Sequence, residues 1–200
     1  MTHTASTAMI ERGDRLWQAI LAGDEHAAAG IAFAALDEGL GIEDVLLELI
    51  APVQAKIGQE WAANRISIAQ EHATTAINDR LIAALTGDPA ARVEPRRGRI
   101  TVACIDGEWH GLPARLLSEV LRLRGWQIDF LGATVPTPHL IAHLHLAGPD
   151  AVALSSSIAT RLPAAHATII ACQAAGVPVL AGGAAFAGDG RYACMLGANG

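Results

Sequence analysis

Four short apolar segments in the second half of the chain constrain its fold more than any other feature. They begin roughly 25 residues apart, as strands separated by helices do, and they cover residues 99–105, 127–131, 150–155 and 177–181. The intervening segments have helical character and end at Gly125 and Gly176, where glycine suits the residue just past a helix. Strands that alternate with helices predict a parallel sheet built from βαβ units.

Ligands bind such sheets beyond the carboxyl ends of the strands. The segments that follow the predicted strands are therefore the candidate binding loops. They cover residues 106–113, 132–136, 155–160 and 182–188.

The first half of the chain has helical periodicity instead. Apolar residues recur near helical spacing in four segments, residues 11–22, 24–40, 42–61 and 67–87. The fourth segment begins with Ser67 and has Gln70 three residues later, which is the spacing of a capping box. Four helices with short connections predict a compact four-helix bundle. Because the Pro- and Gly-containing stretch 87–98 has no periodicity, we assign the bundle to residues 1–88 and the sheet domain to residues 99–200.

Composition limits the classes of function. Hydrophobic residues make up 52% of the 200 residues, which suffices for a buried core. The formal net charge of −6 argues against a large nucleic-acid surface. The one basic cluster is interpreted as a solvated linker rather than a phosphate contact, and it consists of Arg92, Arg96, Arg97 and Arg99.

Cysteine usage and the start of the chain bear on location. The three cysteines lie far apart and indicate neither a disulfide framework nor a zinc site, so we expect a cytoplasmic protein. Cys104 falls in an apolar segment and is expected to be a buried, inert thiol. We find no signal peptide and no apolar run of about 18 residues, so no membrane association is expected.

The first candidate loop carries the most informative side chains. It contains Asp106, Glu108 and His110, so that an acid precedes a histidine by two residues at the mouth of the sheet. An imidazole can ligate a metal through one nitrogen while a carboxylate holds the other, and either acid could take that part. Taken alone, such a pair is more often a surface ion pair than a metal site.

The same loop resembles the D/E-x-H-x-x-G signature of the cobalamin (vitamin B12)-binding domains of methionine synthase, mutases and light-sensing regulators. Glu108 and His110 match the signature, whereas Pro113 stands in place of its final glycine. The resemblance implies that cobalamin is bound base-off, with His110 as the lower axial ligand of cobalt. It further implies that Trp109, Gly111 and Leu112 lie at the cofactor.

Three further loops resemble the same family in order and spacing. Leu131 to Pro136 is similar to its L-G-x-x-V-P turn. Ser155 matches the serine of its S-x-L element, with Ser157 where leucine is usual, and Gly182–Gly183 is similar to its G-G turn. The resemblance implies that the cofactor's displaced nucleotide tail inserts beside these loops. The contacts that it implies are Val135, Ser155, Ser157, Gly182 and Gly183.

The helical half carries a second match. Trp61 is followed ten residues later by Glu71 and His72, which on its own fits a core tryptophan and a solvated Glu–His pair. The spacing resembles the helical cap of B12-dependent photoreceptors, which implies that these three residues line the cofactor's upper side. Ala62 departs from the photoreceptor branch in which a histidine there binds cobalt after illumination, so a second histidine ligand by that route is not expected.

The resemblance implies an α/β chain, a four-helix bundle followed by a Rossmann-like (flavodoxin-like) B12-binding domain. The leading hypothesis is a light sensor that uses adenosylcobalamin. The alternatives are a corrinoid methyl carrier of a methyltransferase system and a B12-responsive binding module, in one variant also open to a bilin. We expect no enzyme, because no Ser-His-Asp order or paired carboxylates occur. No DNA-binding segment precedes the bundle, so we expect output through a protein partner or a further segment, and a homo-oligomer is a further expectation.

Overall fold

The computed structural model describes residues 2–87 and 93–200, with the side chains of residues 2–7 left aside. The chain divides into two compact units, Met1–Arg92 and Val93–Gly200. Arg92, which the sequence places in the basic cluster, and part of the predicted linker lie outside the described residues.

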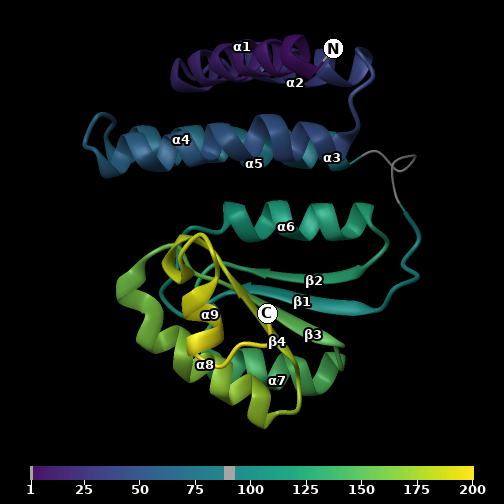
Figure 1. Ribbon diagram of the computed structural model, residues 1–200, viewed down its shortest axis with the longest axis vertical. Helices are drawn as coiled ribbons and strands as arrows, with labels where there is room; N and C mark the ends of the chain where they lie inside the picture. The colour runs from purple at the N-terminus through teal and green to yellow at the C-terminus, as the bar shows by residue number, and fades with distance from the viewer. Residues whose placement is uncertain (1, 88–92) are drawn as a thin grey trace. The chain divides into compact units, whose positions relative to one another are not determined.

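The described residues of the first unit form helices and the turns that join them. Within it, α1 lies beside α2, and α4 lies beside α5 (Figure 1). Its elements are α1 (Thr2–Leu21), α2 (Glu25–Asp37), α3 (Ile42–Asp44), the π-helical segment η1 (Val45–Ile50), α4 (Ala51–Ala62) and α5 (Ile68–Thr86). Its core consists of fully buried aliphatic side chains that include Leu16, Ile20, Leu46, Leu49, Ile50, Ile57 and Ile82.

Side chains at the helix starts set the predicted boundaries. The predicted capping box of α5 is confirmed, because the Ser67 backbone N–H donates to the Gln70 side chain at 2.9 Å and the Gln70 N–H donates back to Ser67 Oγ at 3.2 Å. Asp24 caps α2 by accepting from the backbone N–H of Ala27 at 2.9 Å. These caps satisfy N–H groups that the first turn leaves without a helical acceptor.

The predicted helix over residues 42–61 forms, but with a π-helical stretch inside it. Ala51 N–H donates to the carbonyl of Leu46, five residues back, rather than to residue 47. Pro52 follows at once, and proline has no N–H and its ring clashes with the carbonyl four residues earlier. The wider turn of a π-helix relieves that clash, which gives η1 a local cause.

The second unit is a parallel four-stranded sheet of order β2-β1-β3-β4. The strands are β1 (Arg99–Cys104), β2 (Gln127–Gly132), β3 (Ala151–Ser155) and β4 (Val179–Gly182). Helix α6 (Leu112–Leu123) covers one face, and α7 (Thr137–Ala147) and α8 (Leu162–Ala174) cover the other (Figure 1). Short helices η3 (Ala159–Arg161), η4 (Ala184–Phe186) and α9 (Arg191–Met195) complete the unit. The predicted α/β fold, with a helical region followed by a Rossmann-like sheet, is confirmed.

Two apolar clusters hold the layers together. Ala114 of α6 packs on Ile100, Val102 and Cys104 of β1. On the opposite face, buried residues of α7 and α8 pack against the sheet, and they include Leu140, Leu144, Ile169 and Cys172. Because both faces are covered, the strands are apolar along most of their length, as parallel strands are.

The segment before β1 is anchored to the second unit. The backbone N–H groups of Arg96 and Arg97 both donate to the carbonyl of Gly125, at 3.0 and 3.1 Å. Their side chains are exposed, as predicted for a solvated segment, but Arg99 pairs with Asp129 at 2.7 Å. Within residues 2–87 and 93–200, no helix combines the length and apolar character that crossing a membrane requires.

Candidate functional site

Hydrogen bonds between backbone groups join the four predicted loops at the carboxyl edge of the sheet. Ile105 N–H donates to Ser155, Val135 N–H donates to Cys104, and Ser156 N–H donates to Gly182, at 3.0–3.2 Å. These bonds tie the segments after β1, β2, β3 and β4 to one another. The predicted loop residues of the sheet domain therefore share one edge, where ligands of open α/β sheets bind.

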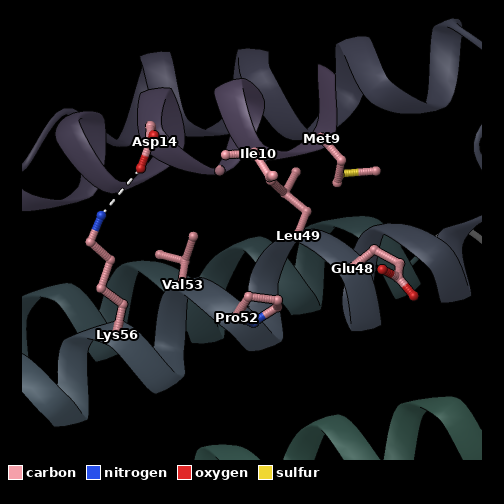
Figure 2. Close-up of a pocket in the computed structure, with 9 residues that line it drawn as sticks. Met9, Ile10, Asp14, Glu48, Leu49, Pro52, Val53 and Lys56 are labelled. Carbon is pink, nitrogen blue, oxygen red and sulfur yellow. Dashed lines mark hydrogen bonds and ion pairs between the residues drawn. The ribbon is translucent and has the colours of Figure 1, made fainter. Parts of the chain in front are cut away.

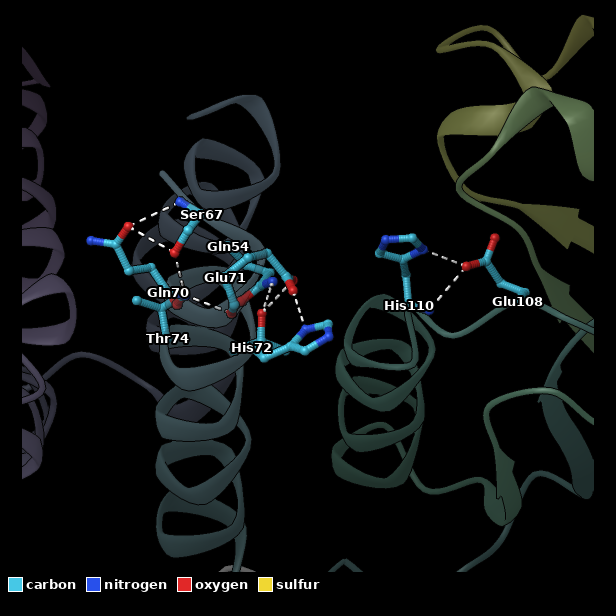
Figure 3. A network of polar contacts seen from close by, with 9 residues as sticks. Gln54, Ser67, Gln70, Glu71, His72, Thr74, Glu108 and His110 are labelled. Atoms are coloured by element: carbon cyan, nitrogen blue, oxygen red, sulfur yellow. Dashed lines mark hydrogen bonds and ion pairs between the residues drawn. The ribbon is translucent and has the colours of Figure 1, made fainter. Parts of the chain in front are cut away.

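Glu108 holds His110 in a single orientation. One carboxylate oxygen, Oε1, lies 2.5 Å from the His110 ring nitrogen Nδ1 and accepts from the His110 backbone N–H at 2.9 Å (Figure 3). The backbone bond fixes the distance between the two residues, and the ring bond fixes the rotation of the imidazole.

The second oxygen of Glu108 reaches a different loop. Oε2 accepts from the backbone N–H of Ser157 at 2.6 Å and from the Ser156 hydroxyl at 3.3 Å. Glu108 is fully buried. Burial alone would raise its carboxyl pKa, but the hydrogen bonds from His110 and Ser157 outweigh it and lower the pKa to about 2. The carboxylate is therefore ionised at neutral pH and acts as an acceptor only.

This arrangement suits a neutral imidazole ligand. A carboxylate that accepts from Nδ1–H fixes the tautomer whose Nε2 lone pair can coordinate a metal. Of the two acids considered from the sequence, Glu108 takes this part, and Asp106 is exposed. The His110 side chain is about one-third exposed, at 32%. Its carbonyl oxygen accepts from the Cys104 thiol at 3.7 Å, so the predicted buried cysteine also braces the histidine loop.

The neighbours of His110 have different environments. Trp109 is 75% exposed, which excludes its packing in the core of this unit. Gly111 precedes α6, and a Cβ added to it would lie 3.7 Å from the Cβ of Ala133 in the next loop. Leu112 begins α6 and is buried.

The paired glycines after β4 serve separate purposes. A Cβ on Gly182 would meet nothing within 4 Å, so this backbone borders open space. A Cβ on Gly183 would lie 2.3 Å from the carbonyl oxygen of Ser156, and the Gly183 φ is +107°. Gly182 thus leaves room for a ligand, whereas Gly183 is required by the fold itself. Ser155 is buried beside them, and Val135 packs on the core with part of its surface exposed.

Three contributors to this edge were not singled out from the sequence. Ser156 is fully buried and bonds Glu108, although Ser155 and Ser157 were the predicted residues. Thr134 has a φ of +48°, and its hydroxyl accepts from Gly107 N–H at 3.2 Å. A Cβ on Gly107 would lie only 2.7 Å from the Arg161 guanidinium. The one sequence feature that points to such contacts between loops is the presence of small residues directly after the strands.

In the helical unit, Glu71 and His72 form a second carboxylate–imidazole pair. Glu71 Oε2 lies 2.5 Å from His72 Nδ1, with Glu71 buried and the His72 side chain 72% exposed (Figure 3). Trp61 lies near the end of α4 and is partly buried. The chain turns after it through Asn64, whose φ of +54° allows Arg65 N–H to reach Glu60 and Asn64 N–H to reach Trp61.

A chain of hydrogen bonds, all donated in one direction, ends on Glu71. Asn78 Nδ2 donates to Gln54 Oε1 at 2.8 Å, and Gln54 Nε2 donates to Thr75 Oγ1 at 2.9 Å. The Thr75 hydroxyl then donates to Glu71 Oε1 at 2.9 Å. Both oxygens of the Glu71 carboxylate are thereby occupied, which fixes the side chain.

Comparison with protein families assigns both units. A family described as the B12 binding domain matches residues 13–86, and a second with the same description matches residues 98–198. The chain belongs to the B12-binding domain family. The predicted membership is thus confirmed for the helical and the sheet units alike.

Individual relatives agree with this assignment. The chain is 32% identical over 144 residues to the HTH-type transcriptional repressor CarH of Myxococcus xanthus, a match that covers 69% of the chain and 46% of that protein. The chain therefore spans about half the length of this relative. The monomethylamine corrinoid protein of Methanosarcina barkeri has the same fold, with a TM-score of 0.76 at 18% identity, covering 94% of this chain and 91% of that one.

The residues at the sheet edge fit a B12 cofactor. A neutral imidazole can coordinate a metal through one nitrogen while a carboxylate holds the other, and the buried Glu108 carboxylate holds His110 in this way. The open space beside Gly182 admits close approach of a ligand to the backbone. The four bonded loops hold these features in one place.

Proposed function

We propose that the protein is a light sensor that binds adenosylcobalamin base-off, with His110 as the lower axial ligand of cobalt. The observation that carries this proposal is the pairing of buried Glu108 with His110 at the carboxyl edge of the sheet, in a chain of the B12-binding family. Adenosylcobalamin absorbs visible light and loses its adenosyl group on photolysis.

The protein's own residues would orient the ligand nitrogen. Glu108 would keep the proton on Nδ1 of His110, which would leave the Nε2 lone pair available to coordinate cobalt. The backbone N–H of Ser157 holds the carboxylate in place at 2.6 Å, so the carboxylate cannot follow a rotation of the histidine without breaking a contact to the next loop of the sheet edge. Trp109, Gly111 and Leu112 would flank the cofactor near this ligand.

The remaining loops would receive the displaced nucleotide tail. Gly182 offers open space, and Ser155 offers a hydroxyl at the same edge. Val135, Ser157 and Gly183 would complete this wall. Their placement at one edge supports the assignment, because a tail entering from the mouth of the sheet must pass these loops.

The helical unit would contribute Trp61, Glu71 and His72 to the upper side of the cofactor. The sequence similarity to a transcriptional repressor supports a regulatory part for the chain rather than substrate chemistry. Loss of the adenosyl group would remove a contact from Trp61, and such a loss can shift the population of two conformations. Ala62 has no side chain that could coordinate cobalt.

The signal would pass to a protein partner or to a further output segment, without direct DNA binding by these residues. Assembly into a homo-oligomer is part of the same proposal. We also assign the protein to the cytoplasm, because its cysteines are free and two of the three are buried, as suits a reducing compartment.

A visible spectrum before and after green light tests the proposal. The protein is purified in the dark with adenosylcobalamin, alongside His110→Ala and the exposed-histidine control His145→Ala. We expect a base-off, His-on spectrum that changes irreversibly in light, and we expect only His110→Ala to lose the His-on character.

Other outcomes would redirect the assignment. Tight binding with photolysis no faster than that of the free cofactor would favour a corrinoid methyl carrier or an occupancy sensor, and methyl transfer from a partner enzyme would identify the carrier. A bilin absorption band in the purified protein would indicate a second chromophore. Absence of cobalamin binding would refute the proposal.

A further inference from the structure

The helical unit contains a groove that the proposed cofactor residues do not use. It has a volume of about 540 Å³ and lies between α1 and the η1–α4 segment (Figure 2). Its lining residues are Met9, Ile10, Gly13, Asp14, Glu48, Leu49, Pro52, Val53 and Lys56. Trp61, Glu71 and His72 are not among them.

The groove has an apolar floor and charged ends. Leu49 and Val53 are buried at its base, while Ile10 on its rim is 63% exposed. Asp14 and Lys56 form an ion pair of 3.2 Å at one end (Figure 2). At the other end, Glu48 is exposed, and its side chain forms no ion pair or hydrogen bond with a described residue.

Two irregularities of the helices form the groove. Gly13 stands inside α1, where glycine costs about 1 kcal/mol relative to alanine, yet a Cβ there would meet nothing within 4 Å. Packing of the described residues therefore does not require a glycine at this position. The facing wall contains the π-helical segment η1 and Pro52, and π-helical turns are frequent at functional sites.

The dimensions of the groove match a docked helix. The wall from Glu48 to Lys56 spans nine residues, and the eight rises between them amount to about 12 Å at the helical rise. The anchor residues i and i+7 of a docking amphipathic helix lie about 10.5 Å apart, so two turns of such a helix fit this length. A glycine on the opposite wall lets a second backbone approach α1 closely.

Charge selects a basic partner. Residues 1–92 hold 13 of the chain's 20 acidic residues and 6 of its 14 basic ones. Glu48 places a carboxylate that pairs with no described residue at one end of the apolar floor, whereas Asp14 at the other end is already paired with Lys56. A Lys or Arg side chain beside an apolar stripe would meet Glu48.

We propose that this groove docks a basic amphipathic helix of a partner protein. Docking itself requires no cofactor. The inference rests on the proposed function only where it identifies the docked helix as part of the output partner.

The experiment uses a fluorescent peptide of about 14 residues, with leucines at helical positions i, i+3, i+4 and i+7 and lysines elsewhere. Its binding to the full chain is followed by anisotropy and by methyl NMR. We expect micromolar binding that weakens with added salt, and shifts centred on the methyl groups of Met9, Ile10, Leu49 and Val53. The same peptide with glutamates in place of lysines is expected not to bind.

Matched variants test the site. Gly13→Leu fills the groove, whereas Gly30→Leu makes the same change at an open glycine of α2 outside it. We expect Gly13→Leu to weaken binding at least about tenfold and Gly30→Leu to leave it unchanged, with both variants retaining the circular dichroism of the parent.

Equal affinity of the two variants, shifts spread over other surfaces, equal binding of the acidic peptide, or absence of binding would each overturn the inference. Each variant's cobalamin spectrum is recorded in parallel. A chain that binds cobalamin His-on but not the peptide refutes the docking helix alone, while the reverse result refutes the proposed cofactor site alone.

Discussion

The carboxylate of Glu108 accepts a 2.6 Å hydrogen bond from the backbone N–H of Ser157, which lies 49 residues further along the chain. The same carboxylate holds the ring and backbone of His110. One buried side chain therefore links the loop that carries the proposed cobalt ligand to the loop after β3.

Replacing this acceptor tests the link. Glu108→Gln keeps the shape of the side chain but turns one accepting oxygen into a donor, which would face the backbone N–H of His110 or Ser157. We expect the cofactor-free protein to lose about 1–3 kcal/mol of unfolding free energy, as for an unsatisfied buried donor. Urea unfolding measures this, with the exposed Asp106→Asn as the control. Equal stability of the two variants would contradict the buried network.

The two glycines after β4 give a matched pair of predictions. Gly183→Ala forces a Cβ against the Ser156 carbonyl at a backbone conformation close to glycine-only, so we expect a loss of about 1–3 kcal/mol or more. Gly182→Ala places its methyl group in open space. It should leave unfolding unchanged and weaken cobalamin binding in a titration. A stable Gly183→Ala protein would show that the loop can shift.

The hydrogen-bond chain in the helical unit predicts a stability effect. Gln54→Leu removes the donor to Thr75 and leaves Asn78 without its acceptor, so about 1–3 kcal/mol of unfolding free energy should be lost. The matched control is Gln59→Leu, an exposed glutamine of the same helix. Thermal or urea unfolding distinguishes the two, and similar values would mean that water replaces the Gln54 contacts.

The buried thiol of Cys172 predicts that the unfolding free energy falls at alkaline pH. Burial raises the pKa of Cys172 to about 11, whereas an unfolded thiol titrates at about 8.5. The unfolded state therefore releases this proton first, so the contribution of Cys172 to stability is complete below about pH 8.5 and is lost as the pH rises towards 11. Unfolding free energies from pH 7 to 11 should fall less steeply for Cys172→Ala than for the parent.

Alkylation checks the same groups independently. Cys194 is exposed, while Cys104 and Cys172 are buried. Iodoacetamide at pH 8 should modify a single thiol in the native protein and three in urea. Mass spectrometry identifies the site, and rapid native labelling of Cys172 would contradict its burial.

The sequence predicted the features that depend on local chemistry. Strands at regular intervals identified the parallel sheet, and Ser67 with Gln70 identified the start of α5. The spacing of Glu108 and His110 predicted a contact that the structure contains. The roles of His110 and the other site residues at cobalt remain predictions.

Features that depend on tertiary contacts were not predictable in the same way. Helical periodicity over residues 42–61 does not reveal how the backbone accommodates Pro52, and the structure does so with η1. Ser156 was passed over for its neighbours, because only the fold decides which of three successive serines is buried against Glu108. The approach of Arg161 to Gly107 likewise depends on two loops that only the sheet brings together.

The bond between Glu108 and Ser157 also orders events in time. The bond spans a long loop, so the entropic cost of closing that loop opposes its formation until β1 and β3 have paired. Until then, nothing from the β3 loop holds the carboxylate that orients His110. The nascent chain therefore gains the full set of contacts around His110 only after β3 has been synthesised and has paired with β1.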